Sequence, residues 1–387
     1  MAITVMASRP SILAFMQPKL PVDRAHAIPT SFTSTPHVAR ARHIVNVNAV
    51  LENRTRPACP PTTPIVGLVS TIIPVFNRAV MIVDSVASVL AQTYRPIEII
   101  LVDDGSDDET PEVLAKLQRD FPDEVRVVTQ PNAGPGAARN AGLAIARGEF
   151  IQYLDSDDRL HPDKFSVQVR QLRSDPAAGV CYCVTNRMDP TTGKMTAWAE
   201  TDKVIDQLFP AFLPKRGWAT LTPLWRKTVC DAIGPWKPLR MMEDWEHDLR
   251  AGLLGVRPVA VDQTLCTVID HDQPRASGMV AGMTSDRVNS LFQAHRSVWY
   301  EMKRISKTDW DYVANFSRTM FWIARLCGER GLVSEAEAAL DLTDEMTKLN
   351  SQPSATHLFR RIKRWLGWKG AVKTVQAIHQ MRKVANR

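Results

Sequence analysis

The sequence predicts an α/β fold with a mixed, mainly parallel central sheet, followed by a C-terminal helical region. Two observations support this fold class. Between residues 65 and 160, apolar β-branched runs alternate with helical patterns at intervals of about 25–30 residues, which indicates right-handed β-α-β units. From residue 286 onward the apolar residues follow helical spacing instead. The 387 residues, 44% of them hydrophobic, are enough for one large domain or two ordinary ones.

Each element of the first half is expected from its own local pattern. Strands are predicted where β-branched residues run together, and helices where apolar residues recur every three or four positions, as at Val80, Val83, Val86 and Leu90. Ligands of such sheets bind at the carboxyl ends of the strands, so the residues after each strand are the first site candidates. In chain order we expect strand 68–73, helix 80–90, strand 97–102, helix 110–119, strand 125–128, helix 136–147 and strand 150–154.

The second half is less regular and then becomes helical. Its tryptophan-rich stretch, residues 198–245, is expected to shape a pocket. The expected elements are helix 165–172, strand 180–184, and helices 288–305, 310–328, 333–349 and 358–384.

The chain therefore divides into four segments. Residues 1–64, rich in Pro, Thr, Ser and Arg without regular periodicity, are predicted to be a disordered basic leader. The α/β domain spans 65–285, with a first half at 65–160 and a second at 161–285. A helical extension covers 286–356, and a basic amphipathic tail covers 357–387.

Charge is unevenly distributed over these segments. The net charge is +7, but residues 1–64 hold seven Lys/Arg against two acids and residues 357–387 hold nine against none, which leaves −7 for the part between. Because the basic residues lie outside the predicted core, no nucleic-acid partner is expected. The tail mixes Leu358, Trp365 and Leu366 with basic residues, which is typical of a helix on an anionic membrane surface. A solvated helix packed on the preceding bundle explains the pattern equally well.

The spacing of the cysteines and the length of the apolar runs indicate the cellular compartment of the protein. Six cysteines lack any Cys-x-x-Cys spacing, which argues against a disulfide framework and against a zinc site. No apolar run has the length of a membrane span, and no cleavage pattern follows the apolar patch at residues 11–16. We expect a cytoplasmic protein, at most peripheral at the inner face of the cell membrane.

Two predicted strand ends carry carboxylates. Asp103 and Asp104 follow strand 97–102, where they can meet a nucleobase, a ribose hydroxyl or a cation, although an Asp-Asp-Gly-Ser run by itself is more typical of a turn or cap. The run at 155–158 contains Asp155 and Asp157, whose clustered charges favour a bound Mg²⁺ or Mn²⁺, usually with a diphosphate. Its alternative role is a cap for a helix beginning near residue 162.

A dinucleotide-binding loop is the sharpest rival interpretation. Gly134 and Gly136 follow a strand and open a helix, and Asp155 lies about twenty residues further on. The third small residue of that fingerprint is replaced by Arg139, so a nicotinamide-dependent oxidoreductase is only a weak alternative.

Two further candidates lie downstream. The pair Glu243 and Asp244 precedes a helical pattern and can place one carboxylate over the pocket as a general base, with helix capping as the alternative. His271 follows a β-like segment, where a structural role is the more common one for a lone histidine.

Taken together, the motifs closely resemble the nucleotide-binding half of family 2 glycosyltransferases, which have the GT-A fold. The resemblance covers about residues 65–285 and makes 65–160 the nucleotide-binding half and 161–285 the acceptor half. The motifs are Pro-Val-Phe-Asn-Arg at 74–78, Ser-Val-Ala-Ser-Val-Leu-Ala-Gln-Thr-Tyr at 85–94, Val-Asp-Asp-Gly-Ser at 102–106, Asn-Ala-Gly-Pro-Gly-Ala-Ala-Arg-Asn at 132–140, Tyr-Leu-Asp-Ser-Asp-Asp at 153–158 and, more loosely, Gly-Pro-Trp at 234–236 before Glu-Asp at 243–244.

The resemblance implies roles for individual residues. A metal, Mg²⁺ or Mn²⁺, would be held by Asp157 directly, with Asp155 on the ribose or the metal's shell and His271 near the diphosphate. Asp244 would be the base of an inverting single displacement from a nucleotide sugar, by family habit a UDP-sugar, to a glycan or lipid-linked acceptor. The nucleotide-binding residues would be Pro74, Phe76, Arg78, Asp103, Asp104, Arg139 and Asp155. A non-catalytic nucleotide- or glycan-binding protein of the same fold is the second hypothesis.

Overall fold

The computed structural model describes residues 63–198, 204–271, 282–354 and 356–385. The chain divides into two compact units, Met1–Ile44 and Val45–Arg387. The first unit, and with it nearly all of the predicted leader at 1–64, lies outside the described residues.

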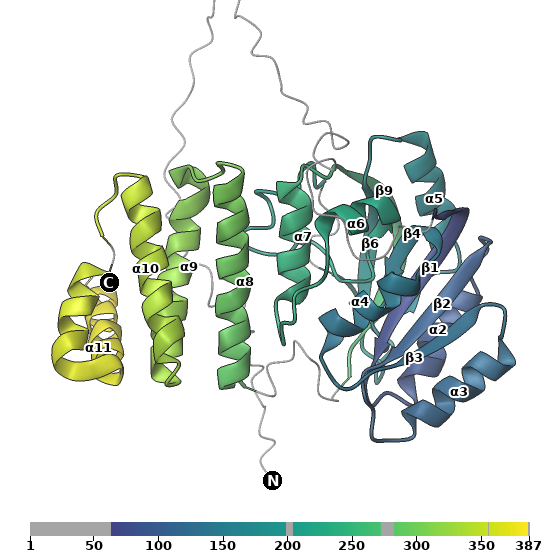
Figure 1. Cartoon of the computed structure of the whole chain (residues 1–387), viewed down its shortest axis with the longest axis horizontal. Coiled ribbons are helices and arrows are strands. Elements are labelled where there is room, and N and C mark those ends of the chain that lie inside the picture. The colour runs from purple at the N-terminus through teal and green to yellow at the C-terminus, as the bar shows by residue number, and fades with distance from the viewer. Residues whose placement is uncertain (1–62, 199–203, 272–281, 355, 386–387) are drawn as a thin grey trace, which may run out of the picture. The chain divides into compact units, whose positions relative to one another are not determined.

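Nine strands in the described part of the chain form one sheet (Figure 1). They are β1 (Ile65–Val75), β2 (Ile97–Asp103), β3 (Val125–Thr129), β4 (Gly148–Tyr153), β5 (Arg159–Leu160), β6 (Val180–Met188), β7 (Met195–Ala197), β8 (Leu224–Arg226) and β9 (Pro258–Ile269). The strand order is β3-β2-β1-β4-β8-β6-β9-β5, with β7 paired to β6. The pairs among β1 to β4 and the pair β6–β9 are parallel, whereas β5, β7 and β8 run antiparallel to their neighbours.

Helices cover both faces of this sheet. They are α2 (Met81–Leu90), α3 (Thr110–Asp120), α4 (Pro135–Ile145), α5 (Lys164–Ser174), α6 (Lys227–Ile233), α7 (Glu243–Leu253), α8 (Ser285–Arg304), α9 (Trp310–Glu329), α10 (Val333–Leu349) and α11 (His357–Ala385). Alternate residues of the central strands enter two separate cores. Ile73 and Leu101 pack with α2, α3 and α5, whereas Ile72 and Val102 pack with α4, α6 and α7. The central strands therefore read as continuous apolar runs, as expected where both faces are buried.

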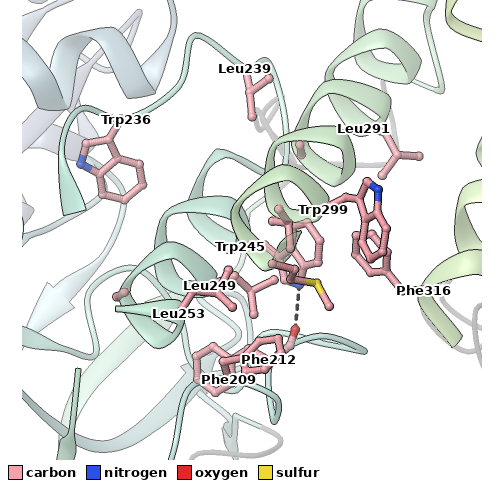
Figure 2. Packing of buried hydrophobic residues seen from close by; sticks show 14 of the residues in the cluster. Phe209, Phe212, Trp236, Leu239, Trp245, Leu249, Leu253, Leu291, Trp299 and Phe316 are labelled. Carbon is pink, nitrogen blue, oxygen red and sulfur yellow. Dashed lines mark hydrogen bonds between the residues drawn. The ribbon is translucent and has the colours of Figure 1, made fainter. Parts of the chain in front are cut away.

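The core on the α4 side continues into the C-terminal helices. Trp245 of α7 stacks on His295 of α8 with ring centroids 4.6 Å apart, and Phe316 of α9 lies 6.4 Å from the same indole. The Trp245 indole also donates a hydrogen bond to the carbonyl of Phe212 at 2.7 Å (Figure 2). The predicted base, Asp244, lies in the first turn of α7. The C-terminal helices therefore pack against an element that carries a candidate site residue.

The predicted fold class, a mixed and mainly parallel sheet followed by helices, is confirmed. The regular elements begin and end within a few residues of their predicted bounds. The prediction did not include β5, β7 and β8, which have two or three residues each, or the seven-residue α6, and of the twelve-residue β9 it noted only a β-like segment before His271. Such short elements are fixed by their neighbours rather than by a local period. Among the described residues, no helix combines the length and apolarity needed to cross a bilayer.

Candidate functional site

Three strand ends meet at one edge of the sheet. Val75, the last residue of β1, pairs with Asp103, the last residue of β2. On the other side of β1, Ile72 pairs with Tyr153 at the end of β4. The loops that carry the predicted motifs at 74–78, 103–106 and 155–158 therefore adjoin, as the parallel arrangement requires.

The end of β1 is tied to the loop after β2. The backbone amide of Asn77 donates to the Ser106 hydroxyl at 3.0 Å, and its side-chain amide donates to Asp107 at 2.6 Å. Asn77 has a positive φ of 53°, a conformation that asparagine tolerates better than most residues. Of the predicted pocket residues, Phe76 is exposed, whereas Pro74 and Arg78 are half-buried.

Asp103 and Asp104 are both buried and hydrogen-bonded within the protein. Asp103 accepts from the amide of Ser106 at 3.0 Å, which is the turn that the sequence allowed. Asp104 accepts at one oxygen from Gln130 and Ala133, at 2.7 and 2.8 Å, and at the other from Gly134 at 2.8 Å. Asp104 thus fixes the loop before α4. The contact of Asp104 with a nucleoside stays a prediction. The oxygen that accepts only from Gly134 can accept one more hydrogen bond, and a nucleoside would have to use that position.

Arg139 lies between the acidic loop after β4 and the acidic first turn of α7. Its guanidinium donates to Asp155 at 2.8 Å and to Glu243 at 3.0 Å, and it lies 4.6 Å from the ring centroid of Trp236. Burial alone would lower the pKa of Arg139, but the two carboxylates outweigh burial and raise it. Burial, followed by the neighbouring Asp244, raises the pKa of Glu243 above its ordinary value despite the arginine. The predicted contact of Arg139 with the nucleotide stays a prediction, because the side chain is enclosed between these partners.

The loop after β4 is held against the end of β9. Asp157 and the His271 imidazole are 2.6 Å apart, and Asp158 accepts from the amide of Ile269 at 3.1 Å. The predicted cap role for residues 155–158 is wrong, since α5 begins at Lys164 after Asp163. The structure instead brings Asp157 of this loop to His271, just after β9, while Asp155 pairs with Arg139.

Asp244 lies in the first turn of α7. One carboxylate oxygen accepts from the amide of Trp245 at 2.7 Å, and the other pairs with Arg216 at 2.8 Å. Arg216 also pairs with the buried Asp248 at 2.6 Å. Burial would lower the pKa of Arg216, but Asp244 and Asp248 together raise it. The Asp244 side chain keeps 31% exposure.

Comparison with known proteins fits this geometry. A sequence profile described as glycosyl transferase family 2 matches residues 70–246, which include both acidic motifs and the Asp244 turn. These residues form a family 2 glycosyltransferase domain.

The relatives of this domain include proteins with named functions. The chain is 38% identical over 139 residues to an uncharacterised glycosyltransferase of Nostoc sp., which covers 36% of this chain and 40% of that protein. It is 36% identical over 160 residues to a succinoglycan biosynthesis protein of Rhizobium meliloti, which covers 40% of this chain and 44% of that protein. It is also 38% identical over 125 residues to hyaluronan synthase of Pasteurella multocida (32% and 13%). The matches thus span less than half of each relative's length.

Solved structures share the fold of the family 2 domain. S. aureus TarS 1-349 in complex with UDP-GlcNAc superposes with a TM-score of 0.58 at 17% identity, covering 81% of this chain and 91% of that one. The uncomplexed TarS 1-349 gives 0.57 at 18% identity with the same coverage. The predicted GT-A fold is therefore confirmed.

The family assignment excludes the dinucleotide-binding interpretation, and the structure supplies the reason for the glycines. A Cβ on Gly136 would lie 2.7 Å from the carbonyl of Lys237, so the glycine allows the segment at Trp236 and Lys237 to approach α4. Arg139, at the third position of the supposed fingerprint, joins the two acidic motifs of the family 2 domain instead.

Sequence reasoning did not find Arg216 and Asp248. Arg216 lies in an irregular stretch, and the signal that could have found it is a basic pair, Lys215 and Arg216, within the tryptophan-rich stretch. Asp248 follows the motif at the i+4 position from Asp244, which places both carboxylates on one face of α7.

Proposed function

We propose that this protein is an inverting glycosyltransferase that moves a sugar from a nucleotide-diphosphate sugar to a hydroxyl of a glycan or lipid-linked acceptor. One observation carries the proposal. Arg139 bonds Asp155 of the Asp-x-Asp loop and Glu243, the neighbour of Asp244, at 2.8 and 3.0 Å. This link supports the proposal that the candidate base and the candidate diphosphate-binding loop act in one site.

The donor would bind at the three strand ends. Phe76 is exposed and Pro74 and Arg78 are half-buried at the end of β1, whereas Asp103 and Asp104 at the end of β2 are buried. S. aureus TarS, which shares the fold, was solved with UDP-GlcNAc, and this supports a nucleotide-sugar donor and favours uridine.

A divalent cation fits the loop after β4. Asp155 and Asp157 offer carboxylate oxygens, the donors that Mg²⁺ and Mn²⁺ prefer, and the His271 imidazole lies 2.6 Å from Asp157. Among the described residues, no three His, Cys, Asp or Glu side chains are grouped to enclose a cation. A cation that takes most of its ligands from water and substrate phosphates needs only one or two protein carboxylates. When bound, it would neutralise charge on the departing nucleoside diphosphate.

Asp244 would act as general base. Its carboxylate takes the proton from the acceptor hydroxyl while the hydroxyl oxygen bonds to the anomeric carbon and the bond from that carbon to the phosphate oxygen breaks. The nucleoside diphosphate leaves with the bonding electron pair, and no covalent enzyme intermediate forms. Base catalysis of this kind contributes about 10²–10⁴ in rate. Arg216 pairs with one oxygen of Asp244 and the amide of Trp245 donates to the other, so the two contacts together orient the carboxylate.

The acceptor class is proposed from the relatives. Proteins named for succinoglycan biosynthesis and hyaluronan synthesis share the domain, which supports a role in polysaccharide assembly.

The test measures release of nucleoside diphosphate from a panel of nucleotide sugars with Mg²⁺ or Mn²⁺. We expect release by the wild type and a fall of about 10²-fold or more in Asp244→Asn, with nucleotide affinity preserved. Asp311→Asn, an exposed first-turn aspartate of α9, is the matched control. Loss of nucleotide binding in Asp244→Asn would make the base assignment wrong. Absence of release with every donor would favour the non-catalytic binding protein, and unchanged turnover with chelator would refute the metal.

A further inference from the structure

The C-terminal helix α11 is docked on the bundle by one of its faces. Phe359 is buried, with its ring 5.4 Å from that of Phe321 on α9. Arg360 pairs with Asp341 at 2.7 Å and with Asp344 at 3.1 Å, both on α10. A third anchor, Lys363, pairs with Glu337 of α10. An acidic stripe on α10 therefore takes up part of the positive charge of the tail.

α11 also carries large apolar side chains that are exposed, on the side away from Phe359 and at the end of the helix before Gly367. Leu358, Trp365 and Leu366 are 60%, 85% and 58% exposed. Leu358, Arg361 and Trp365 are spaced at i, i+3 and i+7, which places them on one side of the helix. Arg361 and Arg364 are exposed among them. We call these five residues the tryptophan face.

A kink places this face at a helix end. Gly367 has φ 65° and interrupts α11 directly after Leu366. Beyond the kink, Lys369 and Lys373 are exposed at i and i+4 and extend the basic surface. Residues 357–387 contain nine Lys/Arg and no Asp or Glu, so no carboxylate of the tail offsets this charge.

We propose that the tryptophan face binds the surface of a lipid bilayer that carries anionic lipids. Tryptophan and leucine beside arginines is the composition of a helix lying at a membrane interface, where the indole enters the headgroup region and the cations meet lipid phosphates. A second copy of the chain fits less well, because a two-fold contact would bring these cations against one another. The inference does not depend on the proposed catalysis.

The test is sedimentation of the full chain with phosphatidylcholine vesicles, with and without phosphatidylserine. We expect binding to the anionic vesicles that weakens at high salt. Arg361→Gln/Arg364→Gln should bind about thirty-fold less tightly, since each cation near such a surface contributes about fivefold. Trp365→Ser/Leu366→Ser should lose most binding at any salt concentration.

Matched controls distinguish vesicle binding by the tryptophan face from non-specific binding through other exposed aromatic or basic side chains. Tyr300→Ser removes a half-exposed aromatic ring from α8, and Arg318→Gln removes an exposed arginine from α9. Both should bind like the wild type, and all variants should melt at the wild-type temperature because the altered side chains are exposed. Equal binding of wild type and Trp365→Ser/Leu366→Ser would overturn the proposal. So would vesicle binding that ignores phosphatidylserine, or a dimer in solution that the same substitutions dissociate.

Discussion

Replacing Arg139 by methionine tests whether the two halves of the site are held together by one buried cation. The side chain is 3% exposed and bonds Glu243, which is 11% exposed, and Asp155, which is 37% exposed. Methionine has a similar length but no charge, so Glu243 would be left buried opposite an apolar group.

The two halves of this interaction contribute unequally. Breaking a buried ion pair by removing one partner costs about 3–5 kcal/mol, whereas a solvent-exposed pair contributes about 0–1 kcal/mol. Because Asp155 is more exposed, the Glu243 half dominates, and we expect a loss of about 3 kcal/mol. At about 2–4 °C per kcal/mol for a domain of this size, the melting temperature should fall by about 6–12 °C.

The assay is thermal melting of a double-mutant cycle. Arg139→Met/Glu243→Gln should recover much of the loss, because no uncompensated charge remains. Arg257→Met, which breaks the more exposed pair with Asp175, should change stability by less than about 1 kcal/mol. A single variant as stable as Arg257→Met, or a double variant no more stable than the single one, would refute the reasoning.

Three other predictions follow from buried groups. Burial lowers the pKa of His295 to about 4, so the unfolded chain, with a pKa near 6.5, binds the proton more tightly. Stability should therefore fall by about 3 kcal/mol as the pH drops from about 6.5 to 4, and His295→Phe should remove that part of the loss in melting experiments at several pH values. Gly142→Ala should destabilise by about 1–3 kcal/mol in denaturant unfolding, since its Cβ would lie 2.4 Å from Ile72; no loss would mean that α4 can shift. Arg216→Met should lower kcat by about 100-fold while nucleotide affinity stays within twofold, because Asp244 loses its orienting partner; a matching loss of affinity would contradict that role.

The framework of the fold could be predicted because its signals are local. The run Ile97–Asp103 is apolar at nearly every position, and it is buried throughout in the structure because helices cover both faces. The acidic residues after β2 and β4 could be placed together for the same reason, since parallel strands end at one edge. The short antiparallel strand β8 could not be predicted, because a run of three residues is too short to show a hydrophobic period.

For the tail, the sequence left membrane binding and packing on the bundle equally open. The structure shows that α11 packs with one face, through Phe359 and Arg360, and presents Trp365 on another. Packing on the bundle is therefore observed, and membrane binding by the exposed side chains stays a proposal that is compatible with it.

The alternating strands and helices, the carboxylates at the strand ends (Asp103, Asp104, Asp155 and Asp157) and the family resemblance can all be recognised in the amino-acid sequence. The partners of these side chains are visible only once the chain is folded. Arg139 meets Glu243 across 104 residues, and His271 meets Asp157 across 114. Such contacts depend on which loops the strand order brings to one edge, and no local spacing encodes that order. The same limit hid Arg216, whose pairing with Asp244 appears only when α7 is packed against the stretch that precedes β8.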